Sequence, residues 1–436
     1  MYLLERDYLL EKDVLKLLEL ETNKYKIVKM SNEIVKNQKI KIILIKCITK
    51  KYRCPICNKF TSSIHDTLKP IKLKHLTIID VLSEIHIIKR RFICHNCNKR
   101  FIEPITINNK NCSLSNRLKI KIRKDLLQYN LSMKYIGQIN GVSDITVRNE
   151  LIEATKEYPE YIKNLPRVIS IDEFKADTDY GKYACIINDP IHKKTIDILP
   201  SRRKDYLINY LTKVNNRHSV EYVISDMYEP YLIVTKVMFP KAKYVVDRYH
   251  YVEHVMDGLD GVRKRLQNEY GEKSREYKIL KNKKNVALLR SYFNDISWYT
   301  YTRRYKNGHM IERLRIDILN EMLEISDELN RGYQLKEAFL DIVNHSTYET
   351  AKKDLFAWIQ LTYESKIDEM IIAGKTIENW LEYIVNSFLD DRFTNGYTEG
   401  LNNKIKVIKR VGFGYKNFKF FRLRLLYILR GKISGK

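Results

Sequence analysis

Three acidic residues in this chain have neighbours that suggest metal chemistry. Glu399 lies in the stretch Thr-Asn-Gly-Tyr-Thr-Glu-Gly-Leu-Asn-Asn-Lys-Ile-Lys at positions 394–406, among amides and ahead of several lysines. Asp172 and Asp226 lie far upstream, and each stands within or directly after a short apolar run. Hard divalent cations prefer oxygen ligands, and such cations assist attack on phosphate esters. The three carboxylates can therefore complete one metal site that acts on DNA.

The residues around Glu399 predict a helix with one polar face. Asn395-Gly396 suits a turn ahead of it, and Glu399, Asn402 and Lys406 recur at three- and four-residue spacing. Such a face can contact a metal and phosphates together, whereas a solvated helix with an arbitrary polar face is the alternative. The residues expected to contact DNA from this helix are Asn402, Asn403, Lys404, Lys406, Lys409 and Arg410.

A basic and aromatic stretch follows the predicted helix. Its cations include Lys409, Arg410, Lys416, Lys419, Arg422, Arg424 and Arg430, and its aromatic residues are Phe413, Tyr415, Phe418, Phe420 and Phe421. Cations of this kind neutralise phosphates, and aromatic rings can stack on bases. We expect the stretch to contact the DNA backbone, with roughly half of the aromatic residues packed inside the domain.

The elements that position the two aspartates begin after Pro166, where short apolar runs alternate with turns. The runs predict strands at residues 168–174, 183–188, 195–199, 222–225 and 243–246. Helices are expected between the third and fourth strands, at 204–213, and between the fourth and fifth, at 231–238. Three strands, helix, strand, helix, strand is the order of an RNase H-like sheet, in which the first and fourth strands are neighbours.

The two aspartates fall on these two neighbouring strands. Asp172 lies inside the first strand and Asp226 at the end of the fourth. An aspartate in an apolar strand is costly to bury unless it meets a cation or hydrogen-bond donors. A metal explains both positions at once, while for either acid alone a capping or salt-bridged carboxylate is the alternative.

Four of the seven cysteines form two Cys-x-x-Cys pairs, Cys54 with Cys57 and Cys94 with Cys97. Two such turns predict one tetrahedral zinc with four sulfur ligands, a structural site with no open position for catalysis. The alternative is four unconnected thiols. The segment between the pairs leaves room for a hairpin or a small helix. The nearby His65, His75, His86 and His95 are expected at the surface or in the core, and Cys47, Cys112 and Cys185 as ordinary apolar residues.

Residues 133–148 read as helix, short turn, helix, within a segment that runs from 113 to 154. Gly141 allows the turn, Ser143 can cap the second helix, and Ile145 with Val147 can pack it back. This pattern resembles a helix-turn-helix, and an ordinary helical hairpin is the alternative. From the second helix we expect DNA contacts by Ser143, Thr146, Arg148 and Asn149.

The bulk composition agrees with a nucleic-acid partner. The chain has 436 residues and a formal net charge of +26, which attracts a phosphate backbone. A generally basic, AT-rich coding background would also give many lysines, so the charge alone does not decide. A hydrophobic content of 44% indicates folded structure. No long apolar run predicts a membrane span or signal peptide, so we expect a soluble intracellular protein.

The order of these motifs resembles transposases of the ISL3 insertion-sequence family, in the class that uses two aspartates and a glutamate on an RNase H-like fold. The likeness covers nearly the whole chain. It comprises the zinc ribbon, the helix-turn-helix, strands with Ile-Asp-Glu-Phe and Ser-Asp-Met, and the carboxy-terminal Tyr-Thr-Glu-Gly-Leu-Asn-Asn-Lys-Ile-Lys. The resemblance implies that Asp172, Asp226 and Glu399 are catalytic acids that bind Mg²⁺ or Mn²⁺.

The resemblance also implies a role for the segment Asp247-Arg248-Tyr249-His250, which matches an Asp-x-x-His signature found after the second aspartate in such groups. Asp247 and His250 would support the active site, although a structural histidine is the alternative for His250. The implied reaction is cleavage at the element's ends and joining of the freed 3′ hydroxyl to target DNA. Two DNA ends must be paired, so a homodimer or higher oligomer is expected.

The expected fold is a multidomain α/β protein. Its segments are 1–112 with the zinc ribbon, 113–165 with the helix-turn-helix, 166–250 and 386–436 as the two parts of the catalytic core, and 251–385 as an all-helical insertion. The first fifty residues are expected to form a short helix and a strand.

Within the insertion, helical spacing is seen at 311–319 and 348–363, and the run Lys281-Asn282-Lys283-Lys284 is expected to be a solvated face. Trp298, Trp358 and Trp380 are expected to pack between helices, with stacking on a flipped base as the alternative.

Two rival functions remain at this point. A catalytically inactive DNA-binding regulator derived from a transposase explains the amino-terminal third but gives no reason for the three acids. A structure-selective RNase H-like nuclease explains the acids but needs neither DNA-reading module. Cleavage with and without metal separates the first rival from a transposase, and strand transfer separates the second.

Overall fold

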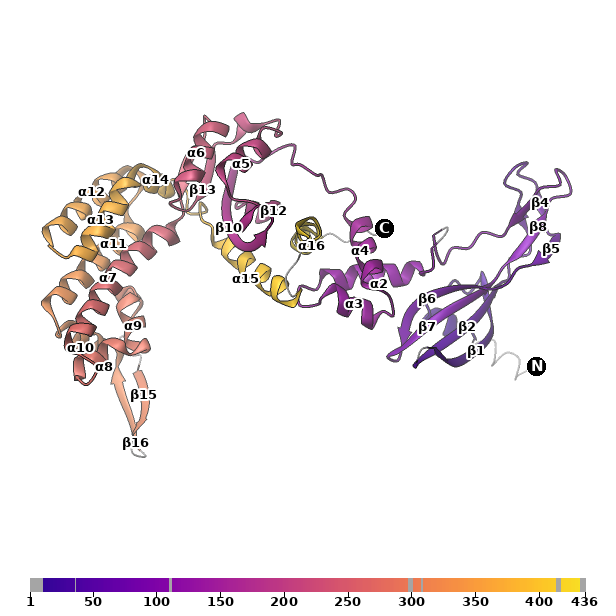
Figure 1. The fold of residues 1–436 in the computed structure, drawn as a ribbon, viewed down its shortest axis with the longest axis horizontal. Helices are drawn as coiled ribbons and strands as arrows, with labels where there is room; N and C mark the ends of the chain where they lie inside the picture. Colours follow the sequence, from indigo (N-terminus) through magenta and orange to yellow (C-terminus); the bar gives the residue numbers. More distant parts are fainter. Residues whose placement is uncertain are drawn as a thin grey trace. The chain divides into compact units, whose positions relative to one another are not determined.

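The computed structural model describes residues 11–35, 37–109, 112–296, 301–306, 309–412 and 417–431 (Figure 1). It is a mixed α/β structure with several sheets, as expected. The chain forms two compact units: a first unit, Met1–Pro159 with Lys404–Lys436, and a second unit, Glu160–Asn403. The boundary between the two units therefore falls inside one helix, α15 (Gly396–Val411).

A five-stranded mixed sheet forms one side of the second unit. Its strands are β10 (Val168–Thr178), β11 (Gly181–Asp189), β12 (Lys194–Leu199), β13 (Tyr222–Ser225) and β14 (Lys243–Val246), in the order β12-β11-β10-β13-β14. The first three are antiparallel neighbours, whereas β13 pairs in parallel with both β10 and β14. Helices α5 (Lys204–Leu211) and α6 (Glu229–Met238) connect the last strands. All seven elements confirm the expected order, because each apolar run is long enough to cross a sheet and is bounded by turn residues.

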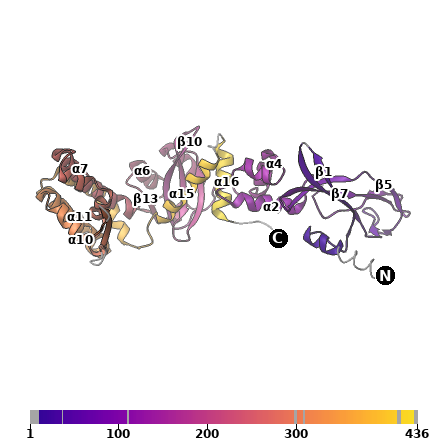
Figure 2. The ribbon, with the colours of Figure 1, turned by 90° about the horizontal axis from the view of Figure 1, so that it is seen from below.

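The helices that follow share one hydrophobic cluster with this sheet. They are α7 (Arg248–Tyr270), α8 (Arg275–Lys281), α9 (Lys283–Arg290), α10 (Arg315–Leu323), α11 (Asp327–His345), α12 (Tyr348–Glu364), α13 (Asp368–Asn379) and α14 (Leu381–Val385). Helix α7 lies beside α11 in both views and also packs against α13 (Figures 1 and 2). Trp358 is buried and donates its indole N–H to the Leu335 carbonyl at 2.7 Å, as expected of a packing residue.

The expectation of an all-helical insertion is wrong. Strands β15 (Tyr301–Lys306) and β16 (His309–Leu314) pair in an antiparallel hairpin before α10. The predicted helix at 311–319 therefore begins only at Arg315. The sequence between the strands, Asn307-Gly308, is typical of a two-residue hairpin turn, and that local signal outweighs the apolar spacing around Ile311. Trp298 lies outside the described residues.

The first unit contains a four-stranded sheet and a helical cluster. Strands β1 (Tyr25–Val35), β2 (Gln38–Cys47), β6 (Ile71–Ile78) and β7 (Val81–Ile88) form the sheet in the order β1-β2-β7-β6. The first fifty residues thus hold two long strands after a helical segment, not the single expected strand. The helices are α2 (Asn116–Leu127), α3 (Met133–Ile139), α4 (Asp144–Ala154) and α16 (Phe418–Arg430), which pack on one another.

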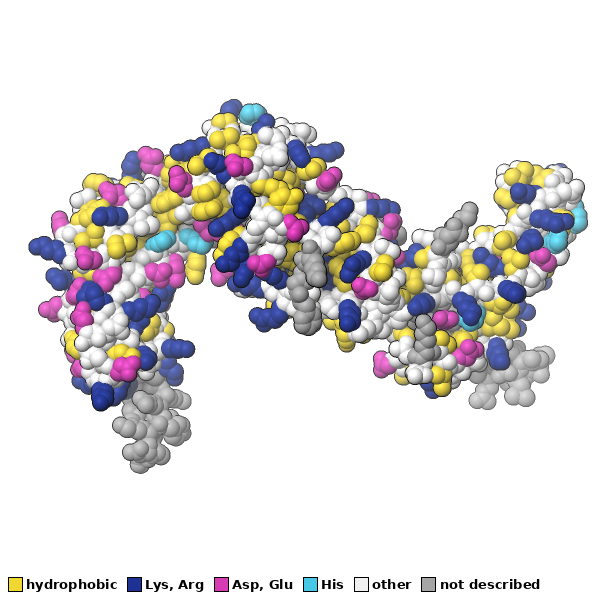
Figure 3. All heavy atoms as spheres, viewed as in Figure 1, with side chains coloured by type: hydrophobic (Ala, Val, Ile, Leu, Met, Phe, Trp, Pro, Cys, Tyr) yellow, Lys and Arg dark blue, Asp and Glu magenta, His cyan; other side chains and the backbone are white. Residues whose placement is uncertain are grey.

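The surface carries its positive charge broadly. Lys and Arg side chains are distributed over the visible face of both units, with acidic side chains among them (Figure 3). Among the residues that the structure describes, no helix is both long enough and apolar enough to cross a lipid bilayer.

Candidate active site and zinc centre

One cavity of about 420 Å³ in the second unit gathers the acidic residues that the sequence singled out. It is bordered by Asp172, Asp226, Asp247, His250 and Glu399. These residues come from β10, the end of β13, the start of α7 and the start of α15, so four separate elements converge on one place.

The parallel pairing of β10 with β13 brings two of the acids together. Ser170 is opposite Ile224 in the register, so Asp172 and Asp226 each follow two residues later on neighbouring strands. Carboxylate oxygens of Asp172, Glu173 and Asp226 all lie within 4.8 Å of one another. These three groups can share one metal ion, since hard cations accept several carboxylate ligands.

The Asp172 carboxylate is held on both oxygens. Its Oδ1 accepts the Glu173 backbone N–H at 2.7 Å, and its Oδ2 accepts the Asn402 side-chain N–H at 2.9 Å. Burial and the neighbouring charge of Asp226 raise the pKa of Asp172 to about 7. Two close carboxylates resist joint ionisation in the absence of a cation. The site is therefore electrostatically prepared for a positive ligand.

Asp247 and His250 form the adjoining wall of the cavity. His250 Nε2 lies 2.6 Å from Asp226 Oδ1 and 4.0 Å from Asp247 Oδ2. Burial opposes the charged imidazole, but its close contact with Asp226 and the surrounding carboxylates raise the pKa of His250 overall. Asp247 is buried and accepts the Asn395 backbone N–H at 2.7 Å, and burial raises its pKa. Through these contacts the start of α7 is held close to Asp226 and to the segment before α15.

Glu399 borders the same cavity but does not join the tight carboxylate group. Its side chain is exposed, one helical turn before Asn402. The amino-terminal part of α15 is fixed against the sheet by Asn402, which bonds to Asp172, and by Thr398, whose hydroxyl accepts the Asn188 amide at 2.9 Å. Views from two directions both place the start of α15 beside β10 (Figures 1 and 2).

The donor set fits a hard divalent cation. Asp226 Oδ1 is buried and lies 2.6 Å from His250 Nε2. Asn402 Oδ1 is buried without a hydrogen-bond partner. An unsatisfied amide oxygen beside two carboxylates suits Mg²⁺ or Mn²⁺, which bind oxygen ligands.

Glu173 is a member of this site that the sequence analysis missed. Its carboxylate is paired with Arg202 and accepts the Tyr231 hydroxyl at 2.9 Å. Arg202 in turn lies over the Tyr183 and Tyr228 rings, at 4.3 and 4.7 Å from their centroids. Glu173 directly follows Asp172, and that adjacency was the available signal. Its partners are distant in the sequence, so only the fold reveals them.

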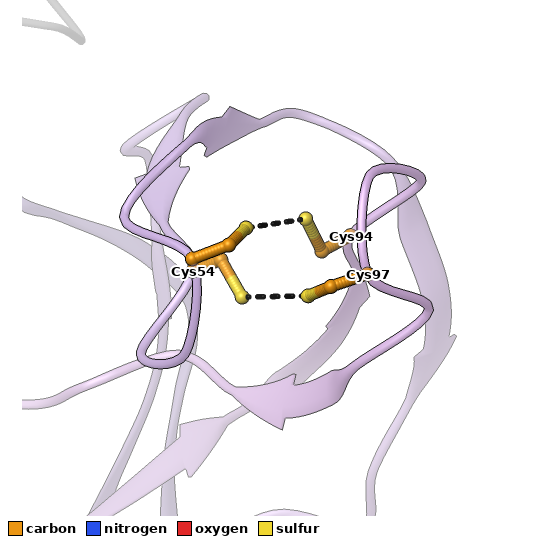
Figure 4. A group of neighbouring side chains, drawn as sticks. Cys54, Cys94 and Cys97 are labelled. Carbon is orange, nitrogen blue, oxygen red and sulfur yellow. Dashed lines mark hydrogen bonds between the residues drawn. The ribbon is translucent and has the colours of Figure 1, made fainter.

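The four paired cysteines converge in the first unit. Their sulfurs all lie within 4.8 Å of one another, and Cys54 faces Cys97 at 3.5 Å while Cys57 faces Cys94 at 3.5 Å. Cys54, Cys94 and Cys97 turn toward a common centre (Figure 4). Such a cluster is compatible with the predicted tetrahedral zinc.

Two turns of the same design present these sulfurs. In each, a Cys backbone N–H bonds to the carbonyl of the lysine five residues later, and Asn58 or Asn98 adopts positive φ. The backbone N–H of Lys59 lowers the pKa of Cys57 to about 6. The turns join β3 (Tyr52–Arg53) to β4 (Phe60–Thr61) and β8 (Arg90–Ile93) to β9 (Arg100–Ile102). The segment between them supplies strand β5 (Ile64–Thr67) and the β6–β7 hairpin.

The other thiols and the nearby histidines behave as expected. Cys47 and Cys185 are buried. His75 is a core residue, with its ring nitrogens 2.8 Å from Ser115 Oγ and 3.0 Å from the Leu18 carbonyl oxygen.

The second helix of the α3–α4 pair carries its four predicted residues at or near the surface. Ser143 caps α4 by accepting the Thr146 backbone N–H at 3.2 Å, and Gly141 has positive φ in the turn. Arg148 and Asn149 are exposed, and Arg148 pairs with Asp144 at 3.1 Å.

Two expectations for the first unit are wrong. Ile145 is 62% exposed and does not pack the helix back; Val147 does so alone. Ile145 lies on the outer side of α4, whereas Val147, Leu151 and Ala154 lie on its buried side. Arg424 is buried and donates to the Gln128 and Leu131 carbonyls, so it cannot contact DNA from that position.

The predicted DNA-contacting residues of α15 fall into one residue of the cavity and several at or near the surface. Asn402 lies in the cavity and donates to Asp172. Asn403, Lys404, Lys406 and Arg410 are exposed, and Lys409 is half-buried. Phe413, Tyr415 and Lys416 lie outside the described residues.

Comparisons with known proteins show that the sequence is similar to transposases. A family model described as transposase matches residues 169–425, which is more than half of the chain. The curated transposase for insertion sequence element IS1001 of Bordetella parapertussis is 21% identical over 387 residues, covering 88% of this chain and 90% of that protein. A curated Lactococcus lactis subsp. lactis protein named as an ATP-dependent protease is 29% identical over 202 residues, covering 44% of this chain and 56% of its own.

The segment Gly374-Lys375-Thr376 resembles the end of a nucleotide-binding loop. Such a loop needs another glycine five residues earlier, where this chain has Glu369. The three residues lie inside α13, and a Cβ on Gly374 would stand 2.1 Å from Thr362 Oγ1. Gly374 therefore serves the close packing of α13 on α12.

Proposed function

Because the chain belongs to the ISL3 family of insertion-sequence transposases, we propose that it binds the terminal inverted repeats of its element and catalyses metal-dependent DNA cleavage and strand transfer. The observation that carries this proposal is the meeting of Asp172, Asp226 and Glu399 at one cavity. These acids are separated by up to 227 positions in the chain, and a merely structural set of carboxylates has no reason to converge there.

We assign the catalytic sheet to the RNase H-like fold. The support is the order β12-β11-β10-β13-β14, with three antiparallel strands followed by two parallel ones. In that assignment residues 166–250 and 386–436 are the two parts of the catalytic core and 251–385 the insertion. The carboxy-terminal part extends past the sheet, because α16 packs with α2 and α4.

In the proposed reaction Asp172 and Asp226 would hold Mg²⁺ or Mn²⁺, with Glu399, which borders the same cavity, as the third acidic ligand. When bound, divalent ions at such carboxylates stabilise charge on the attacking and leaving oxygens and lower the pKa of the attacking water. Asn402 keeps the Asp172 carboxylate in place from α15, and His250 does the same for Asp226 from α7. Asp247 supports the segment that leads into α15.

The chemistry consists of two phosphoryl transfers. In the first, a water oxygen bonds to phosphorus, the bond from phosphorus to the 3′ oxygen breaks, and that oxygen takes up a proton while the water loses one. In the second, the freed 3′ hydroxyl bonds to a target phosphorus and loses its proton, while the bond from that phosphorus to the target's own 3′ oxygen breaks and this oxygen takes up a proton. Both steps need the same arrangement of acids.

We propose that the first unit recognises DNA. The four-cysteine cluster would hold a structural zinc, and α3 with α4 would act as a helix-turn-helix in which Ser143, Thr146, Arg148 and Asn149 face a groove. Exposed cations of α15 would contact the phosphate backbone. Pairing of two ends calls for at least a dimer, and the proposed place of action is the bacterial cytoplasm at the nucleoid.

The decisive experiment uses a labelled duplex with the element's end, an unlabelled target duplex and Mg²⁺. We expect cleavage and joining by the natural protein, and loss of both in Asp172→Asn and Glu399→Gln with retained end binding. Asp179→Asn, on a turn outside the cavity, is the matched control and should remain active. Binding without cleavage in all proteins would instead favour a regulator, and cleavage without joining a nuclease.

A further inference from the structure

Asn395 borders the acidic cavity and directly precedes α15. Its carbonyl accepts the Glu399 backbone N–H at 3.0 Å, so it is the residue that caps the amino end of the helix. Its own backbone N–H donates to Asp247 Oδ1 at 2.7 Å. Asn395 is thus fixed between two of the proposed active-site acids, one turn before Glu399.

The side chain of Asn395 has none of the partners expected at this position. An asparagine before a helix normally accepts a backbone N–H of the first turn. Here the residue is only 4% exposed, and both Nδ2 and Oδ1 lack a hydrogen-bond partner. The N–H of Gly396, the first of the helix, donates to Thr394 Oγ1 at 3.2 Å, and neither polar side-chain atom of Asn395 takes part in the cap. The side chain of Asn395 therefore does not cap the helix, which is the usual role of an asparagine at this position.

An amide with both ends unsatisfied is costly to bury, whereas an apolar side chain of the same shape is not. The missing partner must offer both a hydrogen-bond acceptor for Nδ2 and a donor for Oδ1. A metal ion could engage Oδ1 but would leave Nδ2 unsatisfied. A phosphate beside an attacking hydroxyl offers both groups at once.

We infer that Asn395 contacts the DNA strand at the reacting phosphate, with Nδ2 donating to a non-bridging phosphate oxygen and Oδ1 accepting from the attacking hydroxyl. The inference rests on the proposed function and adds a substrate-contacting residue to it. Asn395 borders the cavity, but its amide atoms are covered in the absence of DNA. The residues on either side, Thr394 and Gly396, are exposed. The proposed contact requires that a bound strand shift this short turn and exchange the Asn395–Asp247 hydrogen bond for contacts with the DNA.

The first test is stability without metal or DNA. Asn395→Leu replaces the amide with an apolar side chain of similar shape, so we expect an unchanged Tm or a rise of about 2–4 °C. Asn188→Leu is the matched control, because that buried amide donates to Thr398 at 2.9 Å. Its loss should lower Tm. A fall in Tm for Asn395→Leu as large as the control's would overturn the inference.

The second test is recognition of the phosphate. In Ca²⁺, we would compare binding of an end duplex with that of the same duplex bearing a neutral methylphosphonate at the cleavage position. The natural protein should lose affinity about tenfold with the methylphosphonate, and Asn395→Leu should bind the two equally. Equal losses in both proteins would contradict the contact.

The third test is the rate of DNA cleavage. In Mg²⁺ we expect Asn395→Leu to cleave about 10²-fold more slowly, as when one donor to a reacting oxygen is removed. Full cleavage by the variant would overturn the inference while leaving the proposed function intact. If the natural protein binds the end but does not cleave, the proposed function fails, and the stability and methylphosphonate results still decide the role of Asn395. If it does not bind the end at all, both fail.

Discussion

At the scale of single residues, the sequence located the acids but not the groups that hold them. Asp172 and Asp226 were predictable because each interrupts or ends an apolar run, and strand pairing then places them together. The contacts of Asp172 with Asn402, and of Glu173 with Arg202, join residues far apart in the chain. No local pattern contains such information, since it depends on how α15 and the loop after β12 return to β10.

The raised pKa of Asp172 predicts that metal binding depends on pH. A cation needs the ionised carboxylate, and with a pKa of about 7 the ionised fraction falls about fivefold between pH 7 and pH 6. The charged form of His250 also competes for Asp226 at low pH. Calorimetric titration with Mn²⁺ should therefore give tighter binding from pH 6 to pH 8. An affinity that is flat over this range would contradict the shift.

The raised pKa of Asp172 has the opposite effect on the stability of the metal-free protein: stability falls as pH rises. Asp172 binds its proton more tightly in the folded protein than in the unfolded chain, so the folded state is favoured at low pH. Stability without metal should decline as pH rises from about 4 to about 7 and then level off. Denaturant unfolding in a chelator, compared with Asp172→Asn, measures this contribution, because the variant should lack that part of the slope.

At the scale of elements, apolar patterning was sufficient to predict the five-stranded sheet of the second unit and insufficient for several other elements. The strand predicted at 222–225 coincides with β13, and that at 183–188 lies inside β11. Hairpin β15–β16 was missed because β15 is rich in Tyr, Arg and Lys and neither strand has a clean alternation of apolar and polar residues. In the first unit, β1 was missed for a similar reason, since much of it is exposed and it packs only at one end.

Alanine should have opposite effects at two helical glycines, because Gly374 is tightly packed between α13 and α12 whereas Gly400 in α15 is not. In Gly374→Ala the new methyl group would clash with Thr362, and we expect a loss of about 1–3 kcal/mol of unfolding free energy. Gly400 in α15 has open space around it, so Gly400→Ala should gain about 0.5–1 kcal/mol from helix propensity. Chemical denaturation of both variants measures these changes. A gain for Gly374→Ala would contradict the packing role.

The paired cysteine turns predict that zinc stabilises one region selectively. Cys57→Ser, or treatment with a strong chelator, should remove one bound zinc per chain and unfold the region of β3, β4, β8 and β9. The second unit has its own core and should keep its thermal transition. Metal analysis and hydrogen exchange report the two effects separately. Exchange protection that is unchanged after zinc removal would argue against a structural metal.

At the scale of the whole molecule, the net charge of +26 is a general property with a measurable effect. Cations spread over both units favour contact with phosphates along a duplex (Figure 3). If about 6–10 phosphates are neutralised, affinity for the element's end should fall about 10³–10⁵-fold between 50 and 200 mM salt. Fluorescence anisotropy across a salt series gives the slope, with Lys404→Gln reducing it by about one. A slope near zero would exclude phosphate contact as the main source of affinity.

One helical core joins segments that are far apart in the chain. Tyr427 of α16 is buried in the cluster that also holds Leu118, Ile136 and Val147 of α2, α3 and α4. During synthesis on the ribosome, this cluster is therefore completed only after α16 has been made, whereas the sheet of the first unit has a core of its own. A polypeptide that stops early, through a nonsense codon or frameshift, lacks this helix, so it should fail to compete with full-length protein for the element's ends.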